Sequence, residues 1–156
     1  MNNKELELYS FLMRESIEFV RYCHHPYKKR IEFEQLIHKS RHKTSVPKVK
    51  VYHIKNSTEF MICIYETVLP DSVETEDIPD KEKNPYSLIA CTPETVTPLG
   101  LVFDTDHRFQ VYIEHRLCNE KYWLFPACSE TSSAVLSPKV FTENFLYKTG
   151  HEIIYY

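Results

Sequence analysis

Residues 47–65 read PKVKVYHIKNSTEFMICIY, and this stretch decides the fold class. Its first half alternates between Lys48 and Lys50 on one side and Val49 and Val51 on the other, a period of two that is typical of a β-strand with one buried face. An Asn-Ser-Thr run then supplies a turn, and the apolar run FMICIY that follows has the composition of a buried strand. The stretch therefore predicts a β-hairpin.

Before residue 47 the apolar residues recur at the spacing of a helix. The pattern predicts one amphipathic helix over residues 4–22, with Asn2 or Asn3 as its N-cap. Pro26 interrupts it, because proline disfavours helical backbone in the residue before it. A shorter helix is expected over residues 27–38. The chain thus divides into a helical part, 1–46, and a β part, 47–156, of a single domain.

The β part contains further strand candidates. They are expected at residues 86–91, 99–103, 108–114, 122–125 and 152–156. Residues 70–85 are acidic and proline-rich with almost no apolar anchors, so we expect a mobile loop there. The pattern predicts an α+β fold in which N-terminal helices are followed by an antiparallel β barrel or sandwich.

Composition excludes several classes of protein. The 156 residues contain only two glycines, Gly100 and Gly150, whereas phosphate-binding loops and dinucleotide fingerprints need several. The same shortage means that strands must be joined by longer loops or by Asn and Asp in left-handed conformation. No apolar run is long enough to cross a bilayer, and the polar start does not resemble a signal peptide. Five cysteines without close pairing indicate reduced thiols. We therefore expect a cytoplasmic protein with no membrane partner.

The charge is distributed unevenly. Residues 21–55 hold ten basic side chains against two acidic ones, Glu32 and Glu34, although the whole chain has a net charge of −3. A cationic stretch on an acidic molecule is typical of a surface that binds phosphates, and a solvated helical face without a ligand is the alternative. Tyr22, Tyr27 and Tyr52 lie among these cations, and exposed aromatics of this kind can stack on unpaired bases.

The sequence therefore predicts an RNA-binding surface. The residues expected to form it are Arg21, His24, His25, Lys28, Lys29, Arg30, Lys39, Arg41, His42, Lys43, Lys48 and Lys50.

Patterns that would support catalysis are weak. His38 and His42 have the spacing of two metal ligands on one helical face, but the glutamate that would follow the first histidine in a metalloprotease is replaced by lysine. His115 and Cys118, with a later cysteine, form a second half-site of this kind. Asp104 and Asp106 resemble a carboxylate pair, yet on a turn such residues usually accept backbone hydrogen bonds. We expect no catalytic residue, no metal, no cofactor and no small-molecule substrate. A zinc-dependent hydrolase is kept as an alternative, ranked after the two functions described below.

Two segments carry a family resemblance. VYHIKNSTEFMICI at 51–64 and TPLGLVFDTDHRFQV at 97–111, with Arg116-Leu117 and the closing residues 150–154, resemble the small eukaryotic Abitram (Simiate) family. The resemblance implies a compact β fold of the biotinyl/lipoyl-like barrel-sandwich hybrid type. It also implies, as an alternative function, a protein-interaction adaptor of the actin-binding or transcription-modulating kind. No lysine stands in a recognisable carrier hairpin, so modification by lipoate or biotin is not expected.

In size and style the chain also resembles the microsporidian ribosome dormancy factors, which occupy functional sites on idle ribosomes. This resemblance implies a non-catalytic, ribosome-associated hibernation factor that inhibits translation by occlusion. Its partner would be the ribosome, with the basic segment on ribosomal RNA and the acidic β part on basic ribosomal proteins.

Overall fold

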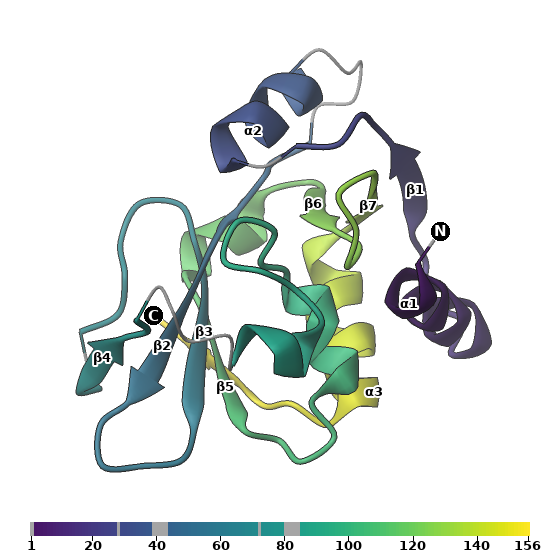
Figure 1. The fold of residues 1–156 in the computed structure, drawn as a ribbon. Helices are drawn as coiled ribbons and strands as arrows, with labels where there is room; N and C mark the ends of the chain where they lie inside the picture. Colours follow the sequence, from purple (N-terminus) through teal and green to yellow (C-terminus); the bar gives the residue numbers. More distant parts are fainter. Residues whose placement is uncertain (1, 28, 39–43, 72, 80–84) are drawn as a thin grey trace.

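The computed structural model describes all residues except 1, 28, 39–43, 72 and 80–84, together with the side chains of 37 and 38. The described elements form an α+β fold with two β-sheets (Figure 1). In chain order they are α1 (Asn3–Arg14), β1 (Val20–Cys23), α2 (Arg30–His38), β2 (Lys48–Ile54), β3 (Phe60–Tyr65), β4 (Thr75–Asp77), η1 (Tyr86–Ile89), η2 (Pro98–Phe103), β5 (Phe109–Ile113), η3 (His115–Asn119), β6 (Trp123–Pro126), β7 (Ser132–Leu136), η4 (Val140–Phe145), α3 (Leu146–Thr149) and β8 (Ile153–Tyr155).

The hairpin predicted from residues 47–65 is confirmed. β2 and β3 pair antiparallel, and the turn between them passes through Asn56 with φ +57°, the left-handed conformation expected in a chain so poor in glycine. The five-stranded sheet has the order β4–β2–β3–β5–β8, and the smaller sheet has the order β1–β7–β6. β3–β5 and β5–β8 are parallel, so the prediction of a purely antiparallel fold is wrong. Neither sheet closes on itself within the described residues, so the predicted barrel is not formed there.

The N-terminal part is not all helical. Asn2 caps α1 as predicted, its side chain accepting a hydrogen bond from the N–H of Glu5 at 2.7 Å. The helix ends at Arg14, eight residues earlier than predicted, and the chain turns through Ser16 in a left-handed conformation (φ +55°). Residues 20–23 then form β1, which pairs antiparallel with β7 near the other end of the chain. The predicted division into a helical part and a β part is therefore wrong, because residues 1–46 contribute an edge strand.

Three further predictions in the β part are wrong. Residues 75–77, expected within a mobile loop, form β4 and pair antiparallel with β2. The apolar runs at 86–91 and 99–103 contain 3₁₀ helices, η1 and η2, instead of strands. A short apolar run fits either structure, because it spans too few residues to show the period of a helix or of a strand. The strands expected at 108–114, 122–125 and 152–156 are confirmed as β5, β6 and β8.

One hydrophobic core holds the two sheets and the helices together. Leu8 and Leu12 of α1 pack into it, and Trp123 and Phe141 make an edge-to-face pair at its centre. Gly100 allows η2 to pack against η1, because a Cβ at this position would lie 2.0 Å from the carbonyl oxygen of Ile89. A second, smaller cluster joins α2 to β6. Among the described residues, no helix has the length and apolar character needed to span a membrane.

Candidate nucleic-acid interface

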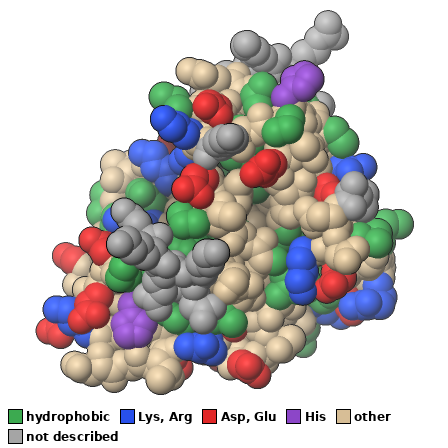
Figure 2. Space-filling view, in the orientation of Figure 1, with side chains coloured by type: hydrophobic (Ala, Val, Ile, Leu, Met, Phe, Trp, Pro, Cys, Tyr) green, Lys and Arg blue, Asp and Glu red, His purple; other side chains and the backbone are tan. Residues whose placement is uncertain are grey.

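The predicted RNA-binding residues do not share one environment. Five of them, Lys28, Lys39, Arg41, His42 and Lys43, lie outside the described residues. The other seven divide into side chains bonded within the fold and side chains left at the surface. Figure 2 shows the consequence on the face it presents: Lys and Arg side chains are interspersed with Asp and Glu instead of forming one continuous positive patch.

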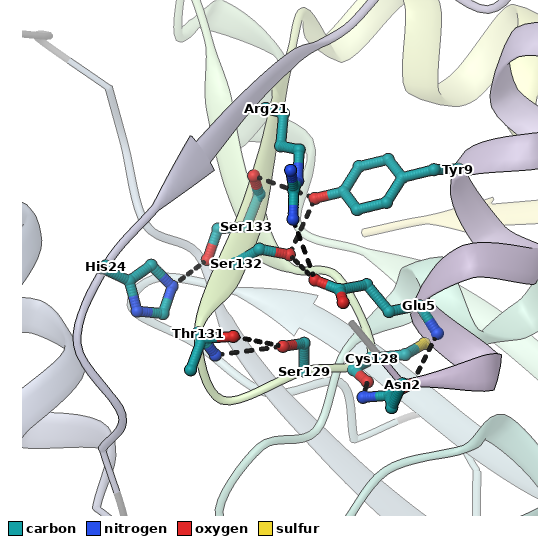
Figure 3. Close-up of polar contacts among 10 residues, drawn as sticks. All are labelled: Asn2, Glu5, Tyr9, Arg21, His24, Cys128, Ser129, Thr131, Ser132 and Ser133. Carbon is teal, nitrogen blue, oxygen red and sulfur yellow. Dashed lines mark hydrogen bonds and ion pairs between the residues drawn. The ribbon is translucent and has the colours of Figure 1, made fainter.

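Arg21 is part of an internal polar network. Its guanidinium lies 3.5 Å from a carboxylate oxygen of Glu5, which is 1 % exposed, and stacks over the ring of Tyr9 (Figure 3). Ser132 donates a hydrogen bond to the same carboxylate at 2.5 Å and lies 2.9 Å from the Tyr9 hydroxyl. Arg21 therefore joins β1 to α1 and β7. These contacts are within the fold, although its side chain is 41 % exposed, so its assignment as a phosphate ligand stays a prediction.

His24 is also held within the fold. Its Nε2 lies 2.9 Å from Ser133 Oγ and its Nδ1 lies 3.0 Å from the carbonyl oxygen of His25 (Figure 3 draws the first contact). Its ring packs against Tyr27 and Phe33. Burial lowers the pKa of His24, because the surrounding rings disfavour the charged imidazolium. His24 is therefore neutral near pH 7 and adds no positive charge to the surface.

Two more cations are paired. Arg30 bonds Glu34 at 3.0 Å, and its terminal nitrogen donates to the carbonyls of Val46 and Pro47, each at 3.0 Å. Lys50 lies 3.8 Å from Asp77 of β4. β4 thus brings an acidic strand alongside the end of the basic segment. This contact neutralises part of the charge on which the sequence prediction rested.

His25, Lys29 and Lys48 are exposed. Arg30 brings two of them into one neighbourhood, because its bonds to residues 46 and 47 fasten the start of α2 beside the start of β2. Lys29 therefore lies close to the segment that carries Lys48. These three are the described members of the predicted set whose side chains have no ion pair or hydrogen bond to another described residue, whereas Arg21 and Lys50 are exposed but paired.

A cavity of about 290 Å³ opens between the start of α2 and the segment 93–96. Its walls include Tyr27, Phe33, Lys29, Arg30 and Glu94. The Tyr27 side chain is 2 % exposed, yet within the described part of the chain its hydroxyl has no hydrogen-bond partner. A buried hydroxyl without a partner costs about 1–3 kcal/mol, and among the described residues Thr44 Oγ1 is also buried without one.

The sequence prediction treated Tyr27 as an exposed aromatic that could stack on a base, whereas the structure buries it. It stood among the aromatics interleaved with cations, directly after Pro26, but nothing local distinguished it from a core residue. Phe33 is 1 % exposed and packs on Tyr27 with ring centroids 4.6 Å apart. Only the tertiary contact with β6 makes Tyr27 part of a cavity wall.

The other candidate sites have structural contacts. Asp104 accepts hydrogen bonds from the N–H groups of Arg108 and Phe109 and lies 2.8 Å from the buried ring of His151. Burial alone would raise the pKa of Asp104, but these hydrogen bonds outweigh it and lower the pKa. Asp106 is exposed and does not join this contact.

No metal cluster is found in the part of the chain that the structure describes: no three His, Cys, Asp or Glu side chains lie close enough to hold an ion. His42 lies outside that part, as does the side chain of His38. All five cysteines are free thiols. Burial raises the pKa of Cys128 to about 12, so this thiol is protonated and a poor nucleophile.

The comparisons with known proteins identify the fold alone. No family model matches the chain, and no curated protein matches it. Among solved structures, the chain is similar to one titled "Crystal structure of hypothetical protein APE2540", with a TM-score of 0.66, 12% identity and 96% of each chain covered. It is also similar to a scaffold from a study of epitope backbone grafting by computational design, with a TM-score of 0.62, 11% identity, and 99% of this chain and 96% of that chain covered.

Proposed function

We propose that the protein is a non-catalytic, ribosome-associated dormancy factor. It binds unpaired ribosomal RNA at the α2 face, where Lys29 lines the Tyr27 cavity and Lys48 precedes the cavity residue Val49 in β2, and it blocks a functional site by occlusion. The observation that carries the proposal is the cavity lined by Tyr27 and Phe33 together with the cations Lys29 and Arg30; beside it, the buried Tyr27 hydroxyl has no hydrogen-bond partner among the described residues.

The cavity has the chemistry that an unstacked base requires. Single-stranded RNA is recognised by bases turned out of the stack, which are held by aromatic walls and hydrogen bonds to their edges. Tyr27 supplies the hydrogen bond and Phe33 the adjoining aromatic wall. Lys29 and Lys48 then contact the flanking phosphates, which supply most of the affinity.

The remaining surface supports a second contact. Glu76 and Asp77 of β4 are exposed, and only part of their charge is neutralised by His53 and Lys50. An acidic edge of this kind attracts the basic proteins that lie among ribosomal RNA. The proposed function implies a cytoplasmic location and requires no cofactor. For the fold, we propose that the two sheets are the layers of a sandwich around their common core.

The test is sedimentation of the purified protein with ribosomes across a salt series. Lys29→Glu/Lys48→Glu is compared with Lys121→Glu/Lys139→Glu, an equal change of charge at exposed lysines outside the cavity walls. The wild type and the control should bind alike. The first variant should bind at least about tenfold more weakly. Because it lacks two lysines that contact phosphates, its slope of log K against log salt should be smaller by about 1.4 on single-stranded RNA.

Equal binding by the two double variants would overturn the proposal. Salt-insensitive capture of a protein partner without RNA would instead favour an Abitram-like adaptor. Stoichiometric zinc in the purified protein would favour a hydrolase.

A further inference from the structure

The C-terminal strand β8 forms one edge of the five-stranded sheet. It pairs with β5 on one side, and none of the described residues forms a strand on its other side. Two hydrogen bonds of Tyr156 fix the direction of the backbone groups. Tyr156 donates its N–H to the carbonyl of Ile113 and accepts from the N–H of His115, so both groups of Tyr156 face β5.

Backbone groups of successive strand residues point to opposite sides. Ile154 therefore faces β5 like Tyr156, whereas the N–H and C=O groups of Ile153 and Tyr155 face the free edge. A strand that pairs with this edge would bond residues 153 and 155.

The side chains at this edge are apolar. Ile154 is 43 % exposed and Tyr155 is 46 % exposed. β8 contains no charged residue and no proline, the residues that usually protect an edge strand from pairing. An open, uncharged edge with exposed apolar side chains is typical of a surface that another strand covers.

We propose that this strand is β8 of a second copy of the chain. The two β8 strands pair antiparallel about a two-fold axis, so that residue 153 of each copy bonds residue 155 of the other. This register uses all four outward groups of each strand in four hydrogen bonds and places Ile154 opposite itself as a non-hydrogen-bonded pair, where side chains approach most closely. The five-stranded sheets of the two copies then form one continuous sheet.

The strand is self-complementary, which is the argument for a second copy over another partner. Reversal about Ile154 exchanges residues 153 and 155, the two positions with outward groups, and places Glu152 of each copy opposite Tyr156 of the other, so no two charged side chains face each other. The contact is short, so the dimer should be weak and its population should depend on protein concentration. This inference does not depend on RNA binding.

Sedimentation equilibrium from micromolar to near-millimolar concentration tests the proposal, with variants that use the position of residue 154 on the axis. Ile154→Lys and Ile154→Glu should each be monomeric, because like charges face each other across the axis. An equal mixture of the two should dimerise at least as well as the wild type, because Lys then faces Glu. Tyr147→Lys, which adds charge off the strand, should dimerise like the wild type.

Circular dichroism of each variant checks that the protein still folds. We expect it to fold, because the side chain of Ile154 is exposed and its replacement does not disturb the core. A wild type that stays monomeric throughout the series would overturn the proposal. Ile154→Lys and Ile154→Glu that do not associate when mixed, although folded, would also overturn it, since residue 154 would then not face itself.

Discussion

The two faces of the small sheet β1–β7–β6 use similar residues in opposite ways. On the α1 face, Arg21 and Ser132 bond Glu5, and these polar groups are satisfied within the chain. On the α2 face, Ser133 bonds His24, but the neighbouring Tyr27 hydroxyl has no partner among the described residues. Arg21 and Tyr22 are adjacent in sequence, as are the two serines, and strand alternation sends the members of each pair to different faces.

This difference separates structural charge from charge that a ligand could use. A basic residue counted in the sequence contributes to binding only if the fold leaves it without an internal partner. Arg21, Arg30 and Lys50 have such partners, whereas Lys29 and Lys48 are exposed and make no ion pair with another described residue. If mutations on the α1 face changed RNA binding, or mutations on the α2 face changed only stability, this distinction between the two faces would be wrong.

Glu5→Ala should have the largest effect on stability. It removes the carboxylate that bonds Ser132 and Arg21 and leaves buried hydroxyl groups without an acceptor, so we expect the free energy of unfolding to fall by about 3 kcal/mol. Denaturant titration followed by circular dichroism measures this change. RNA binding by the folded fraction should be unchanged.

Two variants of α1 sharpen this prediction. Glu5→Gln keeps an acceptor for Ser132 and loses only the charge, so it should cost less than Glu5→Ala. Glu7→Ala removes an exposed carboxylate paired with Lys4 at 3.7 Å and should change stability by no more than about 0.5 kcal/mol. Equal losses for Glu5→Ala and Glu7→Ala would show that the α1 face does not depend on its internal network.

The sequence predicts the elements whose signals are local. β2 and β3 follow from their own alternation and turn, and the start of α1 follows from the cap at Asn2. β1 could not be predicted in this way, because its partner Val135 lies more than a hundred residues from Val20. β7 begins with two serines that are fully buried, which no apolar pattern indicates. Their hydrogen-bond partners are His24, which follows β1, and Glu5 of α1.

In the candidate site, too, the roles that depend on local features could be predicted and those that depend on long-range contacts could not. Lys29 and Lys48 could be selected from charge alone, because exposure requires nothing from the rest of the fold. The internal roles of Arg21 and Arg30 required knowledge of Glu5 and of the carbonyls at 46 and 47. Charge in a sequence is therefore an upper limit on charge at a surface.

His24 gives the α2 face a dependence on pH, which should be the next largest effect. Burial lowers its pKa in the folded state below the unfolded value of about 6.5, so the folded protein binds fewer protons than the unfolded chain in that range. The free energy of unfolding should therefore fall as the pH drops below about 6.5 and should show no contribution from His24 above it.

Denaturant titrations at a series of pH values measure this dependence, comparing wild type with His24→Gln. The variant keeps a polar side chain but cannot titrate, so it should lose part of the decline. Identical pH profiles for the two proteins would mean that His24 has the same pKa in both states and that the α2 face does not disfavour its charge.

Tyr27→Phe should have the smallest effect on stability and the most informative one. The hydroxyl has no partner in the described part of the chain, so its removal costs no hydrogen bond, and we expect stability to stay the same or rise by about 1 kcal/mol. Binding to single-stranded RNA should weaken by about 1 kcal/mol, roughly fivefold, because the ligand loses its hydrogen bond in the cavity.

Tyr9→Phe on the α1 face is the matched control: it removes a hydroxyl that lies 2.9 Å from Ser132, so it should destabilise the fold and leave RNA binding unchanged. If Tyr27→Phe destabilised the protein as Tyr9→Phe does, the Tyr27 hydroxyl would have an internal partner after all, and the two faces would not differ in the way that the proposed function requires.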